Sequence, residues 1–184
     1  MLVNTEITPN PNTLKFLPGK KVSDVGPVEF LKNDKNINIE LAKNIFSLKG
    51  TELIFFGENF ITVKKEPEID WVDLKHNIIS KISDYYSKGN EVIISKNFNK
   101  DLKENPVELN EITKKIHEVL DSKIRPAVAK DGGDIKFKSF KDGVVEVELQ
   151  GSCSGCPSST MTLKQGVQNL LCHYIPEVKR VDAI

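Results

Sequence analysis

The sequence predicts an α/β (α+β) protein of two small domains, each a small sheet packed with helices, joined by a polar linker. Three observations lead to this expectation: short β-type runs between turn residues, longer segments with helical apolar spacing, and a polar stretch near the middle. At roughly 150 residues per domain, 184 residues suit one domain or two small ones. The stretch SKGNEVIISKNFNKDLKEN divides the chain into residues 1–86, a linker at 87–105 and residues 106–184.

In the first domain, β-type runs and helical stripes alternate. Asn38 is positioned to cap a short helix that Gly50 ends, and Asp70 to cap a longer one. The apolar stripe of the longer helix predicts a core face made of Trp71, Leu74, Ile78, Ile82 and Tyr85. The expected strands are Val3–Thr8, Thr13–Phe16, and a hairpin of Leu53–Phe56 with Phe60–Val63, plus a short strand at Val92–Ile94 in the linker.

In the second domain, a helix is expected to start at Asn105-Pro106 and to end or bend at Pro126. A three-residue loop at 141–143 predicts a hairpin in which apolar pairs share one face and opposite charges the other. A further helix from about Ser158 to His173 and a strand at Val178–Ala183 complete the domain. The predicted pairs are Lys138 with Glu146, Lys136 with Glu148, Phe137 with Val147, and Ile135 with Leu149.

Charge and composition exclude several functions. Lys plus Arg and Asp plus Glu both number 26, and residues 1–106 (15 of each sign) and 107–184 (11 of each) are separately neutral. A nucleic-acid binder or a polybasic membrane anchor would need an excess of basic residues. No signal or transit peptide is visible, and the longest apolar run, Leu53–Phe56, is far too short to span a membrane. We therefore expect a soluble protein of a reducing cytosol.

The segment LQGSCSGCPSST carries the most specific chemistry. Cys153 and Cys156 lie in a loop between a predicted strand and a predicted helix, with Gly151 and Gly155 allowing a tight turn. Cys156 precedes a helix start, where the unpaired N–H groups and the helix dipole favour thiolate over thiol. Three interpretations stay open at this point: half of an iron–sulfur site, half of a zinc site, or a thiol–disulfide redox pair.

The number of ligands favours sharing between chains. Zinc and common iron–sulfur clusters take four ligands, and this loop offers two. Cys172 and His173 lie about 24 Å along the following helix at 1.5 Å per residue, so they are expected to be helix-face residues. His76 and His117 are expected to be surface or structural. Two chains related by a twofold axis would bring four thiolates to one centre.

Around these cysteines the sequence resembles a known family. IRPAVAKDGGDIKFKSFKDGVVEVELQGSCSGCPSSTMTLKQGVQNLLCHYIPEVKRV is similar to the C-terminal domain of the NifU-like (Nfu) iron–sulfur proteins. TPNPNTLKF, LAKNIFSLKG and FFGENFITVKK resemble the N-terminal domain that accompanies it. The DGGD segment (131–134) matches the family pattern as well, and we assign it to turn geometry. The family's cysteine motif does not include Cys172.

The resemblance implies a carrier and not an enzyme, located in the cytoplasm of a bacterium or in the mitochondrial matrix of a eukaryote. It implies a [4Fe-4S] cluster, or a [2Fe-2S] cluster, held by Cys153 and Cys156 and bridged between two subunits. The cluster would come from an upstream scaffold and pass to apo iron–sulfur proteins, with a homodimer as the loaded form. By elimination, the cysteine-free N-terminal domain is expected to be a recognition or regulatory module. The alternatives are a thiol–disulfide oxidoreductase and a bridged structural zinc site.

Overall fold

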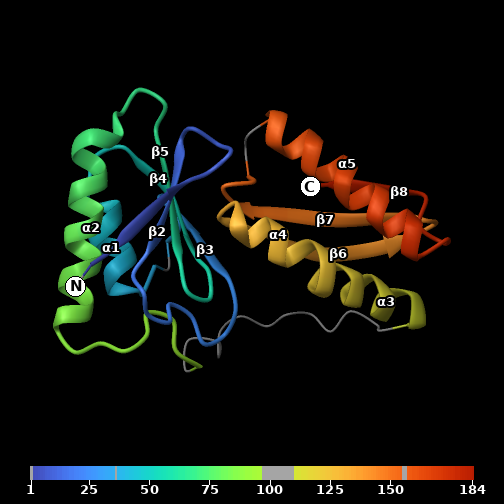
Figure 1. Ribbon diagram of the computed structural model, residues 1–184, viewed down its shortest axis with the longest axis horizontal. Coiled ribbons are helices and arrows are strands. Elements are labelled where there is room, and N and C mark those ends of the chain that lie inside the picture. Colours follow the sequence, from blue (N-terminus) through green and yellow to red (C-terminus); the bar gives the residue numbers. More distant parts are fainter. Residues whose placement is uncertain (1, 36, 97–109, 155–156) are drawn as a thin grey trace. The chain divides into compact units, whose positions relative to one another are not determined.

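The computed structural model describes residues 2–35, 37–96, 110–154 and 157–184, the side chains of 157–159 excepted. The chain divides into two compact units, Met1–Lys103 and Glu104–Ile184, which we describe separately. Each unit combines a small sheet with helices, so the predicted α+β class is confirmed (Figure 1). Within the described ranges, no helix is both long enough and apolar enough to cross a bilayer.

The first unit is built on one antiparallel sheet. Its strand order is β1-β2-β5-β4-β3, so β1 and β3 form the edges. The predicted hairpin is present as β4 and β5, in which Phe56 lies opposite Ile61. The strands are β1 (Asn4–Ile7), β2 (Thr13–Leu17), β3 (Val28–Leu31), β4 (Thr51–Phe56) and β5 (Ile61–Lys65).

Helices α1 (Glu40–Phe46) and α2 (Trp71–Ser87) pack side by side on one face of this sheet (Figure 1). Asp70 caps α2 as predicted, because its carboxylate accepts a hydrogen bond from the Val72 N–H at 2.9 Å. The predicted cap of α1 is wrong: Ile39, not Asn38, occupies the cap position, and its side chain makes no capping bond. Burial of Leu41, Ala42 and Ile45 against the sheet stabilises this short helix instead.

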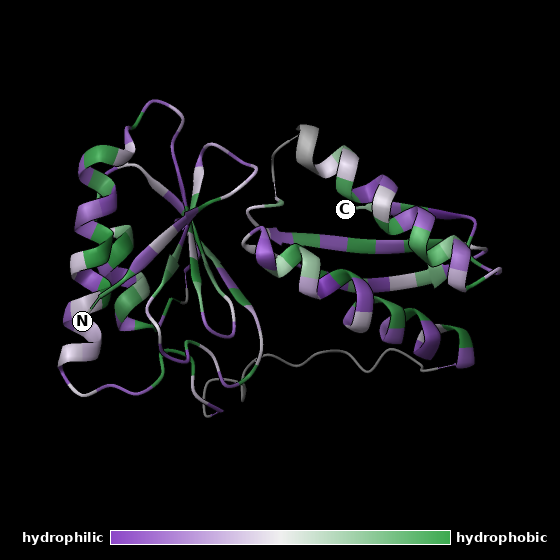
Figure 2. Cartoon of the chain, in the orientation of Figure 1, coloured by the Kyte–Doolittle hydropathy of each residue, from purple (hydrophilic) through white to green (hydrophobic). Residues whose placement is uncertain are grey.

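Helix α2 differs from the prediction in its last turn. Its buried stripe is Leu74, Ile78, Ile82 and Tyr86, with Tyr86 in place of Tyr85. The apolar stripe and the polar outer side of α2 are visible as alternating colours (Figure 2). The Tyr86 hydroxyl donates to the Lys21 carbonyl at 3.1 Å, and burial raises the pKa of this tyrosine well above its usual value.

The first part of the predicted linker packs onto the first unit. Ile93 and Ile94 are 6% and 0% exposed and join the core. A single parallel bridge pairs Ile94 with Ser23, so the predicted short strand is reduced to one bridge. Tyr85 stabilises this segment by donating to the Val92 carbonyl at 3.1 Å. Residues 97–105 of the predicted linker lie outside the described residues.

The second unit has a three-stranded sheet covered by helices on one face. The order is β6-β7-β8, with β6 and β7 antiparallel and β8 parallel to β7. One apolar cluster joins Ile116, Val145, Val167 and Leu171, so both helical segments face the same core. The elements are α3 (Glu111–Val119), η2 (Leu120–Ile124), α4 (Arg125–Lys130), β6 (Gly133–Lys141), β7 (Val144–Gly151), α5 (Pro157–Tyr174) and β8 (Arg180–Ala183).

The β6–β7 hairpin confirms part of the predicted register. Ile135, Lys136 and Phe137 pair with their predicted partners, Leu149, Glu148 and Val147. The pairing of Lys138 with Glu146 is wrong, because β6 has a bulge at this point and Ser139 lies opposite Glu146. The loop has two residues, not three: Asp142 and Gly143 both have positive φ, 52° and 84°, as a type I′ turn requires.

The helix before β6 also departs from the prediction. Its predicted start at Asn105-Pro106 lies outside the described residues, and the described helix α3 begins at Glu111, capped by Asn110. Pro126 does not end the helix. Residues 120–124 form a π-helical turn, in which the Arg125 N–H bonds to the Leu120 carbonyl. This wider turn accommodates the proline ring, which would otherwise clash with the preceding turn and which lacks an N–H.

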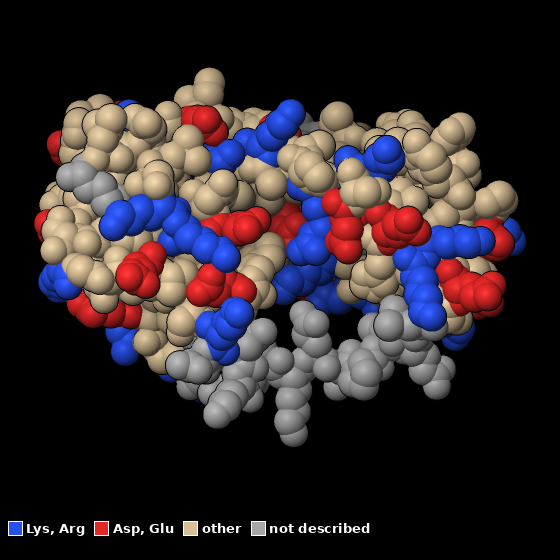
Figure 3. All heavy atoms as spheres, turned by 60° about the horizontal axis from the view of Figure 1, so that its bottom comes forward, with Lys and Arg blue, Asp and Glu red and all other residues tan. Residues whose placement is uncertain are grey.

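Some charged side chains of this sheet form ion pairs, among them Lys138 with Glu148 and Arg180 with Asp182. Figure 3 shows charges of both signs on one side of the molecule. Glu148 pairs with Lys138 and accepts a hydrogen bond from the Gln150 amide at 2.9 Å. Burial opposes ionisation of Glu148, but these hydrogen bonds outweigh it and lower the pKa. Since the folded pKa is depressed, the resulting stability is complete above the usual pKa of 4.5 and disappears as pH falls through the folded value.

We expect Glu148→Gln to destabilise the second unit at pH 7 by at most about 1 kcal/mol, as is usual for a partly exposed pair. The variant should also lose stability less steeply than the wild type below pH ~4.5. Urea unfolding between pH 3 and 7 measures both effects, and Glu118→Gln on the exposed side of α3 is the matched control. An unchanged pH profile for Glu148→Gln would contradict the assignment.

Candidate functional site

The predicted cysteine loop lies between β7 and α5, as expected. Strand β7 ends at Gly151, whose φ of 69° turns the chain out of the sheet. Ser154 then donates to the Gly151 carbonyl twice, from its backbone N–H at 3.2 Å and from its hydroxyl at 2.9 Å. The loop therefore reverses direction tightly. Gly155 and Cys156 lie outside the described residues, and α5 begins at Pro157.

The loop is attached to the turn that precedes β6. The Ser152 N–H donates to the Gly132 carbonyl at 3.2 Å, and the Ser152 hydroxyl donates to the Asp131 carbonyl. Gly132 has a φ of 82°, which exposes these carbonyls in a tight turn. The DGGD segment thus forms the predicted turn and also holds the cysteine loop, 20 residues further along the chain.

Cys153 is buried, with 5% of its surface exposed, and its sulfur lies against Gly133. A Cβ at position 133 would lie 2.8 Å from the Cys153 Sγ and 2.6 Å from the Gln150 carbonyl oxygen, both too close for real contacts. Thr160, in the first turn of α5, donates from its hydroxyl to the Cys153 carbonyl at 3.1 Å. The strand, the DGGD turn and α5 together fix the position of this cysteine.

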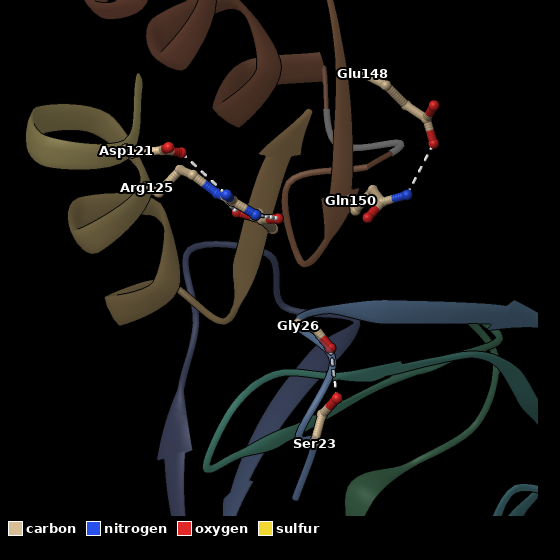
Figure 4. A network of polar contacts seen from close by, with 7 residues as sticks. Ser23, Gly26, Asp121, Arg125, Glu148 and Gln150 are labelled. Carbon is tan, nitrogen blue, oxygen red and sulfur yellow. Dashed lines mark hydrogen bonds and ion pairs between the residues drawn. The ribbon is translucent and has the colours of Figure 1, made fainter. Parts of the chain in front are cut away.

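An ion-pair clamp supports the start of β6. The Arg125 guanidinium donates to both carboxylate oxygens of Asp134, at 2.9 Å and 2.7 Å, and to Asp121 at 3.0 Å (Figure 4). Asp134 is 3% exposed, so its charge depends on this partner. The hydrogen bonds to Asp134 raise the pKa of Arg125 against the effect of burial. We refer to Arg125, Asp134 and Asp121 as the β6 clamp.

The β6 clamp and the role of Gly133 are not predicted from the sequence. The sequence places Asp134 in the turn before the strand, whereas the structure includes it in β6 and buries it. A carboxylate next to a strand with an apolar face was a usable signal, because a buried carboxylate requires a partner. Arg125 lies beside Pro126, which the sequence marks only as the end or bend of a helix.

The remaining candidate ligands lie elsewhere in the unit or have other contacts. Cys172 is partly buried on α5 and packs against the core, which agrees with its predicted helix-face role. The His117 ring lies edge-on to Phe137, with centroids 4.8 Å apart, and His173 contacts Tyr174. Among the residues that the structure describes, no three His, Cys, Asp or Glu side chains gather as a metal site. The ligand pair of Cys153 and Cys156 stays a prediction.

The two units and the loop define an α+β protein with a cysteine pair at a strand–helix junction. The sequence profile of the NifU-like domain matches residues 116–182, and the profile described as scaffold protein Nfu/NifU N terminal matches residues 3–89. Similarity to proteins named as members of this family extends over the whole chain. The chain belongs to the Nfu family of NifU-like proteins.

Two relatives illustrate the similarity. The chain is 42% identical over 185 residues to the human protein named NFU1 iron-sulfur cluster scaffold homolog, mitochondrial, covering 100% of this chain and 72% of that one. It is 41% identical over 186 residues to NifU-like protein 4, mitochondrial, of Arabidopsis thaliana, covering 99% and 65%. A solved structure of a NifU-like protein from Saccharomyces cerevisiae aligns with a TM-score of 0.48 at 28% identity, over 52% of this chain and 86% of that one.

Proposed function

We propose that this protein carries an iron–sulfur cluster as cargo, held by the thiolates of Cys153 and Cys156, and delivers it to apo-proteins. The observation that supports this most directly is the attachment of the Cys153 loop to three separate elements, next to the start of α5. These contacts hold the sulfur of Cys153 in place, and a cysteine at the N-terminus of a helix is favoured as thiolate. The names of the relatives, which describe cluster scaffolds, support the same role.

A complete cluster site requires a second chain. Common clusters take four protein ligands, and the proposed loop supplies two. We therefore propose a [4Fe-4S] cluster, or a [2Fe-2S] cluster, bridged between two copies of this chain, with a homodimer as the loaded form. The mitochondrial names of the relatives favour the mitochondrial location among the two expected from the sequence.

Delivery requires ligand exchange and no net oxidation or reduction. Each recipient thiolate forms one iron–sulfur bond as the bond to Cys153 or Cys156 breaks, and the freed thiolate takes up a proton from water. The cluster arrives by the reverse exchange from an upstream scaffold. The protein is thus proposed as a carrier and not as an enzyme with turnover.

We expect Cys153→Ser and Cys156→Ser each to abolish stable cluster loading, while Cys172→Ser loads like the wild type. Anaerobic reconstitution with iron and sulfide, followed by visible absorption, iron and sulfide analysis and native mass, measures cluster content and dimer formation. A cluster that binds equally well without Cys153 and Cys156 would contradict the proposal. Zinc in place of iron after anaerobic purification would favour the bridged zinc site, and insulin reduction without iron would favour the thiol–disulfide oxidoreductase.

The first unit contains no cysteine, and we propose that it recognises recipients or regulates delivery. Since Ile93 and Ile94 belong to its core, the informative truncation removes residues 1–96 and not 1–86. We expect the truncated chain to load as much cluster as the full chain and to transfer it more slowly to particular recipients. Equal transfer rates to every recipient tested would contradict a recognition role.

A further inference from the structure

The outer side of α5 lacks charged residues. Its exposed positions include Gln165, Gly166, Asn169, Leu170 and His173, which we call the α5 outer face. Among the described residues of α5, Lys164 alone carries a fixed charge, and it pairs with Asp182 at 3.0 Å, away from this face. Charged residues make up 28% of the whole chain, so an exposed helix face without any is unusual for this protein.

Gly166 lies at the centre of this face without a structural reason inside the unit. A Cβ at this position would meet no atom within 4 Å, and its φ is not in the left-handed region. A glycine inside a helix lowers the folding equilibrium constant about fivefold relative to alanine. Gly166 and the other residues of this face are exposed. A missing side chain at an exposed position of a helix allows a second helix to approach closely.

The face continues directly from the cysteine loop. Helix α5 begins at Pro157, directly after Cys156 in the sequence, and Gly166 follows Pro157 by nine residues, about 14 Å along the helix. If two copies share one cluster at their loops, the two α5 helices start near the same centre. A twofold axis through that centre brings the two helices close enough for the α5 outer face of one copy to contact that of the other.

We propose that the α5 outer face binds the same face of a second copy of this chain, around a twofold axis that passes near the shared cluster. This inference rests on the proposed function. The absence of charge argues for a second copy as the partner. A residue near a twofold axis lies close to the same residue of the second copy, so a charged side chain there would face a like charge. A face without charges avoids this repulsion.

The size of the face fits a dimer that forms on loading and separates on delivery. An 18-residue helix is about 27 Å long and about 10 Å wide, which limits the contact to roughly 270 Å² per partner. Stable interfaces bury about 800 Å² per partner. The helix contact is therefore too small to hold two chains together alone, and it adds to the bonds that the cluster supplies.

Two substitutions test the proposal on the full chain loaded anaerobically with cluster. Gly166→Gln adds an uncharged side chain that separates the helices, and Asn169→Glu places like charges across the axis. Each should raise the dissociation constant of the loaded dimer at least tenfold, measured by sedimentation and native mass. Gly166→Gln should also raise the melting temperature of the unloaded chain, because glutamine is the better helix former. Asn77→Glu, at an exposed position of α2, is the matched control and should leave the dimer unchanged.

The outcomes separate this inference from the proposed function. If the wild type takes up no cluster through Cys153 and Cys156, the proposed function fails. If the loaded wild type is a dimer and the dissociation constants of both loaded α5 variants are within twofold of the wild-type value, the inference alone is overturned. Contact of the face with the first unit of the same chain would also overturn it, and hydrogen exchange would show this as altered protection in residues 1–96 of unloaded Asn169→Glu.

Discussion

Arg125→Leu is expected to destabilise the second unit by about 3 kcal/mol, because it leaves the Asp134 carboxylate buried without its cationic partner. Asp121→Asn removes the exposed member of the β6 clamp and should cost less than about 1 kcal/mol. The double variant Arg125→Met/Asp134→Leu should recover most of the lost stability, since both charges are then absent.

The single tryptophan, Trp71, provides an internal control for this experiment. Because Trp71 is in the first unit, its fluorescence reports unfolding of that unit and should not change in Arg125→Leu. Unfolding of the second unit is followed by labelling of the buried Cys153 thiol under native conditions, which should become at least tenfold faster in the variant. Slow labelling like that of the wild type would contradict a supporting role for the clamp.

The clamp also affects the proposed site without touching it. Asp134 fixes the start of β6, and the turn just before it carries the carbonyls that hold Ser152. A loosened β6 therefore releases the cysteine loop. We expect Arg125→Leu to reconstitute with less cluster per chain than the wild type at a temperature where both are folded.

The hairpin illustrates how far local sequence determines structure. Apolar and charged faces alternate along both strands, so the pairing of Ile135 and Phe137 could be predicted from the sequence. Their register also suited a three-residue loop, but the structure places the extra residue in β6, as a bulge at Lys138, and uses a two-residue turn. Both arrangements give the same pairs far from the turn. Only the turn conformation distinguishes them, and it depends on the positive φ that Asp142 adopts.

In the candidate site, too, the sequence predicts what depends on neighbouring residues and not what depends on tertiary contacts. Cys153 and Cys156 are separated by two residues in one loop, and that spacing alone predicts a metal or redox site. The contacts that position Cys153 come from Gly133 and Thr160, and the attachment of Ser152 to Asp131 spans 21 residues. Such contacts follow from the tertiary fold and leave no periodic pattern in the sequence. Pro126 is a similar case, since a π-helical turn allows the helix to pass a residue that usually ends it.

Gly133→Ala is expected to disturb the cysteine loop strongly. The added Cβ would lie 2.6 Å from the Gln150 carbonyl oxygen, which belongs to the paired strand β7 and cannot move without breaking the ladder. The Cys153 sulfur, 2.8 Å away, must therefore move as well. Overpacking of this kind costs about 1–3 kcal/mol, and we expect a value near the upper end because one of the two contacts is backbone.

Gly166→Ala is the matched control for the stability of the unloaded chain, because the same substitution there meets no atom within 4 Å and should preserve or slightly increase stability. Chemical unfolding of the unloaded second unit is measured for both variants, and cluster content after reconstitution is compared between Gly133→Ala and the wild type. Gly133→Ala should lose cluster content severalfold even where it remains folded, since the Cys153 thiolate, which we propose holds the cluster, is displaced. Full cluster content in folded Gly133→Ala would mean that the loop tolerates displacement. Attachment of the loop to the DGGD turn would then serve the stability of the fold and not the geometry of the sulfurs.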